Sequence, residues 1–201
     1  MTVPSTGAEA VVQPSAAIIL AGGRGSRMGG QDKPALLLEG RTLLQIACGA
    51  VGDAPTVVVG PARALPPGVL AVTENPPGGG PAAAVVTGLA ALPGLDPNAL
   101  IAVLAADLPG IEPDTITRLC VAAAPASSAV LVDPGGRRQY LTGVWRCSRL
   151  TAAAGVRPDW TGRPLRELLE PIPVREIAGS AAETADVDTQ PDWERWRRKR
   201  P

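Results

Sequence analysis

The sequence predicts an α/β protein with three layers, in which a mostly parallel sheet is covered by helices on both faces. Three observations predict this class. Strand-like and helix-like segments alternate along the chain. The strand-like segments are short apolar runs, which is typical of parallel strands buried on both faces. Of the 201 residues 45% are hydrophobic, yet there is no Phe and only one Tyr, so we expect a core of Ala, Val, Leu and Ile.

The first half of the chain supplies three of the expected strands. Ala16–Leu20 is uncharged and β-prone, which predicts a buried strand. A helix is expected over 42–51, then a strand over 56–60 and a short extended piece over 69–73. The Ala-rich stretch 81–92 predicts the next helix.

The second half continues the alternation. Residues 100–105 predict a fully buried strand, and Pro113 fits the first position of a helix that runs to residue 124. Thr189 to Asp192 has the spacing of a capping box for a final helix. Three more strands are expected in between, over 128–132, 140–145 and 172–177.

The expected domain organisation is simple. No internal repeat or interior low-complexity linker divides the chain, so we expect a disordered N-terminal extension over residues 1–14 and one domain over 15–201. Ligands of such sheets bind beyond the carboxyl ends of the strands. We therefore expect one shared edge for the loops that follow four strands, after Leu20, Gly60, Thr73 and Ala105.

The most informative segment follows the first expected strand and runs from Leu20 to Lys33, with the sequence L-A-G-G-R-G-S-R-M-G-G-Q-D-K. Its five glycines let the backbone turn N–H groups toward an anion without a Cβ in the way. Arg24, Arg27 and Lys33 add positive charge at the same place. Such a loop suits a triphosphate or a pyrophosphate leaving group, so the sequence indicates nucleotide chemistry.

Other interpretations of this loop are a tight turn and the two commoner phosphate loops. A glycine-rich loop after a strand is often only a tight turn. The dinucleotide pattern G-x-G-x-x-G fails because Met28 stands at the third glycine, and Gly60 and Pro61 stand where an acidic residue is needed. The P-loop pattern fails because Lys33, the nearby lysine, is followed by proline rather than by Ser or Thr.

The motif L-A-G-G-x-G-x-R-M-G-x-x-D-K resembles the signature of the MobA-like nucleotidyltransferases, and within them most resembles the molybdenum cofactor guanylyltransferases. The same resemblance, which covers roughly residues 15 to 195, is carried by three later segments: 74–81 (E-N-P-P-G-G-G-P), 104–109 (L-A-A-D-L-P) and 186–189 (D-V-D-T).

This resemblance implies a fold and a reaction. The fold is a Rossmann-like sheet that carries one antiparallel strand. The reaction is transfer of GMP from GTP to the terminal phosphate of molybdopterin or Mo-molybdopterin, which forms molybdopterin guanine dinucleotide and pyrophosphate. The expected cofactor is Mg²⁺, and further partners are molybdoenzymes and their maturation chaperones.

Asp107 is the candidate metal ligand. A lone carboxylate at a strand end is often a turn or cap residue, but this one is expected on the same edge as Arg27 and Lys33. Nucleotides bring Mg²⁺, which binds through one or two carboxylates plus phosphate oxygens. The resemblance identifies Asp107 as the family's metal-binding aspartate. The catalytic candidates are therefore Arg27, Lys33 and Asp107.

The nucleotide-binding candidates come from the glycine loop, the 74–81 segment and the metal ligand. Glu74 could accept from N1–H and N2–H₂ of guanine together. The first turn of the helix after Gly80 offers free N–H groups, although its glycines could also be a flexible linker. The full set is Leu20, Ala21, Gly22, Gly23, Gly25, Lys33, Glu74, Gly80 and Asp107.

Two further segments carry open alternatives. Asp186 and Asp188 either serve the turn before the last helix or belong to the site; the guanylyltransferases often have asparagines there. The basic turn Gly135–Tyr140, together with Arg163, is either solvated or contacts the anionic pterin substrate.

Composition excludes several classes of function. The chain has no histidine, which rules out Ser-His-Asp hydrolysis, Cys-His proteolysis and His-ligated zinc. The net charge is zero, so no global basic field favours nucleic acid. Neither a signal peptide nor a membrane-spanning run is expected, and three cysteines without metal-ligand spacing favour reduced thiols in the cytoplasm.

Three functions compete at this stage. The leading one is the guanylyltransferase. The second keeps the chemistry with other substrates, as a cytidylyltransferase, a sugar-phosphate nucleotidyltransferase or another MobA-like enzyme. The third is a non-catalytic nucleotide-binding adaptor of molybdoenzyme maturation, which the joint presence of Arg27, Lys33 and Asp107 disfavours.

Overall fold

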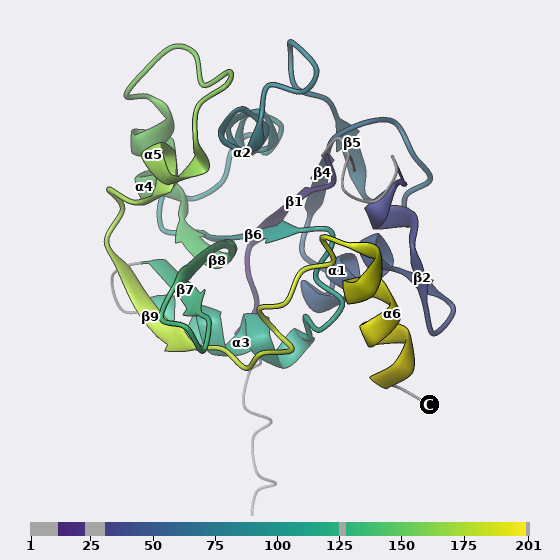
Figure 1. Cartoon of the computed structure of the whole chain (residues 1–201). Coiled ribbons are helices and arrows are strands. Elements are labelled where there is room, and N and C mark those ends of the chain that lie inside the picture. Colours follow the sequence, from purple (N-terminus) through teal and green to yellow (C-terminus); the bar gives the residue numbers. More distant parts are fainter. Residues whose placement is uncertain (1–11, 23–30, 125–127, 200–201) are drawn as a thin grey trace, which may run out of the picture.

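The computed structural model describes residues 12–22, 31–124 and 128–199 (Figure 1). Of the expected N-terminal extension, residues 1–11 lie outside this part, and Pro14 is buried just before the first strand. The strands are β1 (Ala16–Leu20), β2 (Leu37–Leu38), β3 (Arg41–Thr42), β4 (Thr56–Val59), β5 (Leu70–Val72), β6 (Leu100–Ala105), β7 (Ser128–Val132), β8 (Arg138–Arg146) and β9 (Val174–Ala178). The helices are η2 (Lys33–Ala35), α1 (Leu43–Ala50), α2 (Pro81–Ala90), α3 (Pro113–Ala123), α4 (Cys147–Ala154), α5 (Leu165–Leu169) and α6 (Gln190–Lys199).

A seven-stranded sheet in the order β5-β4-β1-β6-β8-β7-β9 forms the centre of the molecule. Every neighbouring pair is parallel except the two pairs that involve β8. The three-layer, mostly parallel, Rossmann-like class with one antiparallel strand is therefore confirmed. β8 runs the other way because a tight turn joins it to β7, in which the Asp133 carboxylate accepts from the N–H groups of Gly135 and Arg137.

Two apolar cores lie on opposite faces of the sheet. Along β1 the side chains alternate between them, with Ala17 and Ile19 in one core and Ile18 and Leu20 in the other. Figure 1 shows α1, α3 and α6 on one face and α2, α4 and α5 on the other. A strand with both faces covered has no solvent side, which explains why its sequence is a continuous apolar run.

The expected aliphatic core needs a correction, because tryptophan contributes to both faces. Trp145 is fully buried on β8, where its ring stacks on Tyr140 with 6.4 Å between centroids. Trp160 and Trp193 are also buried, on opposite faces of the sheet. The low aromatic fraction concealed them, because a few large side chains are enough to fill volume that small residues leave open.

Most predicted elements occur at or within two residues of their expected bounds. Three helices were not expected: η2, α4, which follows β8 without a break, and α5, which lies beside α2. The short strands β2 and β3 were not expected either. The capping box before α6 is confirmed, since Thr189 Oγ1 and the Asp192 backbone N–H are 3.3 Å apart and the Asp192 carboxylate accepts from the Thr189 N–H. Among the described residues, no helix is both long enough and apolar enough to cross a membrane.

Helix α2 packs closely against the sheet at Gly88. A Cβ there would lie 2.5 Å from Cγ2 of Ile18 and 3.1 Å from Cγ2 of Val59. We expect Gly88→Val to lower the free energy of unfolding by about 1–3 kcal/mol, because a well-packed core resists added volume. Urea denaturation followed by circular dichroism measures the change. The control is Ala90→Val on the exposed side of the same helix. An equal loss in both variants would mean that helix propensity, not packing, decides the result.

Candidate functional site

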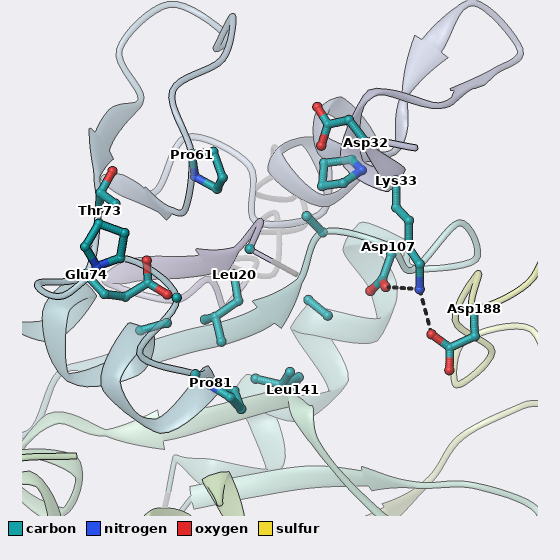
Figure 2. A pocket seen from close by; sticks show the side chains of 18 of the residues that line it. Leu20, Asp32, Lys33, Pro61, Thr73, Glu74, Pro81, Asp107, Leu141 and Asp188 are labelled. Carbon is teal, nitrogen blue, oxygen red and sulfur yellow. Dashed lines mark hydrogen bonds and ion pairs between the residues drawn. The ribbon is translucent and has the colours of Figure 1, made fainter. Parts of the chain in front are cut away.

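A pocket of about 730 Å³ opens where β1, β4, β5 and β6 end (Figure 2). These strands are parallel, so their carboxyl ends meet at one edge of the sheet and the expected sharing of one edge is confirmed. The pocket is lined by Leu20, Gly22, Gln31, Asp32, Lys33, Pro34, Pro61, Thr73, Glu74, Pro77, Gly78, Gly80, Pro81, Ala84, Ala105, Ala106, Asp107, Leu141 and Asp188.

The described site candidates gather in this pocket. Its lining includes six of the nucleotide-binding candidates: Leu20, Gly22, Lys33, Glu74, Gly80 and Asp107. Ala21 lies beneath it, buried, with its carbonyl oxygen accepting from Arg63. Gly23, Gly25, Arg24 and Arg27 lie outside the described residues.

The basic turn and Arg163 do not line the pocket. Arg137 pairs with Asp133 inside its own turn, and Arg138 pairs with Glu176 on β9. The loop of Arg163 is nevertheless joined to the pocket, because the Gly162 N–H donates to the Gly79 carbonyl at 2.8 Å.

Lys33 is the centre of the charged end of the pocket. Its Nζ donates to Oδ1 of Asp188 at 2.6 Å and lies 3.7 Å from Oδ2 of Asp107 (Figure 2). The short helix η2 begins at Lys33, where the Ala35 N–H donates to the Asp32 carbonyl at 2.9 Å. One ammonium group is thus held between two carboxylates that come from the middle and the end of the chain.

Asp188 reaches this place through a backbone contact. The N–H of buried Val187 donates to the carbonyl of Asp107 at 3.1 Å, which sets Asp186 and Asp188 beside Asp107. Glu183 anchors the same segment to α3, because its carboxylate accepts from the Thr115 hydroxyl at 2.6 Å. Of the two aspartates of the D-V-D-T segment, Asp188 therefore lines the pocket, and Asp186 lies close enough to Asp107 to raise its pKa.

The carboxylates at this end are not fully compensated. Burial raises the pKa of Asp107 above its ordinary value; the Lys33 amine lowers it, and Asp186 and Asp188 raise it further. Burial also raises the pKa of Asp186, and the charge of Asp188 adds to that effect. Among the described residues at this end, negative charge exceeds positive charge, so an added cation would be stabilised.

The donor set fits a hard cation that arrives with a nucleotide. Among the described residues, no group of three or more His, Cys, Asp or Glu side chains is placed to hold a metal by itself. Mg²⁺ at nucleotide sites keeps several waters and phosphate oxygens and takes only one or two carboxylates. Asp107 and Asp188, both in the pocket lining, offer such oxygens.

Glu74 occupies the other end of the pocket (Figure 2). The residue is only 7% exposed, and it makes no hydrogen bond or ion pair with the described part of the chain. Glu74 lines the pocket. A ligand that brings N–H groups to Glu74 would supply its carboxylate with donors.

Apolar side chains separate the two charged ends. Figure 2 shows Leu20, Pro81 and Leu141 below them. Leu141 reaches the pocket at a bulge in β8: Val130 pairs with Gly143, but the next residue, Leu131, pairs with Gln139. Bulges commonly redirect side chains beside functional sites. Leu141 could not be predicted as a pocket residue, since the alternation of side chains along a strand carries no sign of a bulge.

Helix α2 begins at the pocket with glycine at its N-cap. Gly80 has φ +92° and ψ 172°, a backbone conformation open essentially to glycine alone. The chain then turns directly into α2 at Pro81, whose missing N–H is no loss at a helix start. The glycines before Pro81 thus form a defined N-cap and not a flexible linker.

A family model, described as the MobA-like NTP transferase domain, matches residues 17–176. No curated protein is a significant match. Among solved structures, Rv0371c from Mycobacterium tuberculosis H37Rv is similar, with a TM-score of 0.71 and 22% identity over 93% of this chain and 99% of that one.

Two other similar structures carry names of different activities. Molybdopterin-guanine dinucleotide biosynthesis protein A from Archaeoglobus fulgidus has a TM-score of 0.67 and 18% identity over 91% of this chain and 97% of its own. The 2-C-methyl-D-erythritol 4-phosphate cytidylyltransferase from Thermus thermophilus has a TM-score of 0.66 and 20% identity over 93% of this chain and 98% of its own. At such identities the likeness supports the fold.

The raised pKa of Asp107 generates a prediction about stability. Folding favours the protonated form of an acid whose pKa is raised in the folded state. Above pH 3.8, the ordinary pKa of an aspartate, ionisation of Asp107 therefore lowers the free energy of unfolding. We expect Asp107→Asn, measured with a chelator and without nucleotide, to raise the melting temperature at pH 7.5. This gain should shrink as the pH falls toward 3.8.

The control for this prediction is Asp53→Asn, at an exposed position. Its melting temperature should equal that of the unchanged protein at both pH values. A lower melting temperature for Asp107→Asn at pH 7.5 would contradict the view that the carboxylate is held at a cost to the fold.

Proposed function

The chain belongs to the family of MobA-like NTP transferase domains, and we propose that it is a guanylyltransferase that joins GMP to molybdopterin or Mo-molybdopterin. A terminal phosphate oxygen of the pterin attacks the α-phosphorus of GTP, the bond from that phosphorus to the bridging oxygen breaks, and pyrophosphate leaves. The observation that carries the proposal is a pocket with two different ends: the Lys33 cluster for phosphates and, for a base, the Glu74 carboxylate, which has no donor among the described residues.

Lys33 acts on the phosphates. Its ammonium group has three N–H donors. Asp188 and Asp107 hold this group at the edge of the pocket. A cation fixed in place beforehand stabilises the charge that develops on the leaving group without reorganising. From the sequence motif, we expect Arg27 and the N–H groups of Gly23 and Gly25 to bind the phosphates together with Lys33.

The attacking group needs little help from a base. A phosphate monoester has a second pKa of about 6, so the acceptor is mostly ionised at pH 7. The protein has to hold two anions in line and screen their charges, which agrees with a chain that has no histidine.

Asp107 and Asp188 are the residues we assign to Mg²⁺, on the basis of their oxygens beside Lys33. When bound, the ion supplies positive charge against the triphosphate and the departing pyrophosphate. One of the similar structures is a complex of Rv0371c with manganese, which supports a divalent ion in this fold.

Glu74 is proposed to choose the base. Guanine presents two adjacent donors, N1–H and N2–H₂, to one carboxylate, whereas cytosine offers its single amino group. A site built for two donors leaves its carboxylate poorly paired when the wrong base enters. Leu20, Pro81 and Leu141 would pack against the base or its sugar.

Two alternatives and the cellular setting complete the proposal. A cytidylyltransferase is the second candidate, favoured by the similarity to the enzyme from Thermus thermophilus. An adaptor that binds nucleotide without turnover is the third.

Cys48, Cys120 and Cys147 are free thiols, which supports a reducing cytoplasmic setting. Molybdoenzymes and their chaperones would receive the product there.

The experiment that tests the function is a pyrophosphate-release assay. It combines GTP, CTP, ATP or UTP with molybdopterin, Mo-molybdopterin or 2-C-methyl-D-erythritol 4-phosphate, each with Mg²⁺ and with Mn²⁺. The proposal expects release only when GTP and a pterin acceptor are both present. Release with CTP and the erythritol phosphate would establish the second candidate, and binding without release would establish the adaptor.

Lys33→Ala should lower turnover by about 10² to 10³-fold, because one preorganised charge-assisted contact to the leaving group is lost. Steady-state pyrophosphate release measures the effect, and circular dichroism checks that the variant is folded. The matched control is Arg175→Ala, which removes a cation from an exposed position on β9. Full activity in folded Lys33→Ala would remove Lys33 from the mechanism.

Glu74→Gln should reduce the preference for GTP. In the unchanged protein, GTP at 100 times its dissociation constant adds about 2.7 kcal/mol of stability. A shift in melting temperature of roughly 5–10 °C follows for a domain of this size. Glu74→Gln should lose most of that shift with GTP and less of the smaller shift with CTP, whereas Glu194→Gln on α6 should behave like the unchanged protein. A larger shift with CTP in the unchanged protein would refute guanine selection.

A further inference from the structure

Arg63 lies outside the motifs and outside the pocket lining, yet it joins three segments at this edge. Nη2 donates to the Ala21 carbonyl at 2.7 Å, Nη1 to Oδ1 of Asp32 at 2.9 Å, and Nε to the Pro61 carbonyl at 3.2 Å. The side chain is only 11% exposed. Ala21 and Asp32 stand before and after the glycine-rich segment, so a single guanidinium links both sides of it.

The backbone around Gly60 brings Arg63 to this position. A Cβ on Gly60 would lie 2.8 Å from the Ala21 carbonyl carbon and 2.9 Å from the Gly22 nitrogen. The chain after β4 therefore packs directly on the chain after β1, which only glycine permits at this distance. The Thr73 hydroxyl holds the same turn, donating to the Gly60 carbonyl at 2.9 Å.

We propose that Arg63 is a positioning residue that fixes the phosphate-binding end of the pocket. It holds Ala21 at the start of the glycine-rich segment, and it holds Asp32, the N-cap of the short helix η2 on which Lys33 lies. The ligand class that depends on this arrangement is a nucleoside triphosphate, so the inference rests on the proposed function.

The chemistry of the three contacts requires arginine. A guanidinium presents donors in a planar fork and can satisfy three acceptors in different directions, whereas the ammonium of lysine is a compact point charge. Arg63 does not line the pocket, each of its guanidinium nitrogens donates to an oxygen of Ala21, Asp32 or Pro61, and its charge is paired with Asp32. Its effect therefore acts through the position of Lys33 rather than through contact with the phosphates.

Two readouts test the role of Arg63. The first is amide hydrogen exchange without nucleotide: Arg63→Met should speed exchange at Ala35 and Leu36, whose N–H groups bond to the carbonyls of Asp32 and Lys33. The second is the affinity for Mg–nucleoside triphosphates, with kcat and KM where turnover occurs. A misplacement of about 1 Å costs on the order of 10²-fold in kcat/KM, and we expect a loss of that order in Arg63→Met. The kcat/KM of Arg63→Lys should lie between those of Arg63→Met and the unchanged protein.

Arg146→Met is the matched control, because Arg146 also donates to three backbone carbonyls, of Asn98, Ala123 and Ala124, but beside the amino end of β6. It should lose thermal stability without changing exchange at Ala35 and Leu36, nucleotide affinity or kcat/KM.

Three results would overturn the proposal: unchanged exchange in Arg63→Met, faster exchange with unchanged nucleotide affinity, or an equal loss of affinity in Arg146→Met. If the unchanged protein binds none of the four nucleotides, the proposed function fails. The exchange comparison then still decides whether Arg63 holds residues 32–36 in place.

Discussion

The parallel pairing of β1 with β4 on one side and β6 on the other is the constraint on which the site depends. Leu20, the last residue of β1, pairs with Val59 and with Ala105, the last residues of their strands. Three chain segments therefore leave the sheet at one level, and the Ala106 N–H still bonds to the Leu20 carbonyl at 2.9 Å. Ala21 and Gly22, the Arg63 turn and Asp107 lie at the same edge because these three strands end together.

The charged end of the pocket opposes the stability of the fold. Burial and neighbouring carboxylates raise the pKa values of Asp107 and Asp186, while Lys33 compensates only in part. Proteins retain such arrangements where function needs them, and stability is lost in exchange. Glu74 lies at the opposite end, as an acid that is little exposed and has no donor among the described residues. A ligand that brings positive charge to one end and N–H groups to the other would complement both.

Long-range contacts turn the separate loops into one unit. The Val187–Asp107 backbone bond attaches the C-terminal segment to the end of β6, and Glu183 attaches it to α3 by accepting from Thr115. The Gly162–Gly79 bond attaches the loop of Arg163 to the N-cap of α2. The guanidinium of Arg63 does the same for the segments before and after the glycine-rich motif. These bonds thus link each loop to the surroundings of Lys33 or to the start of α2.

The sequence by itself determined the fold class, most element bounds and six of the residues that line the pocket. The reasons are local: apolar runs such as Leu100–Ala105 have the length and the unbroken apolar character of buried strands, Pro113 and Thr189 mark helix starts, and glycine-rich loops follow strand ends. Only the tertiary structure decided what depends on contacts between distant residues. The bulge that turns Leu141 into the pocket and the pairing of Lys33 with Asp188 belong to this class. The bonds from Arg63 to Ala21 and Asp32 also belong to this class. Arg63 is 42 positions from Ala21 and 31 positions from Asp32, and contacts over such separations leave no periodic signal in the sequence.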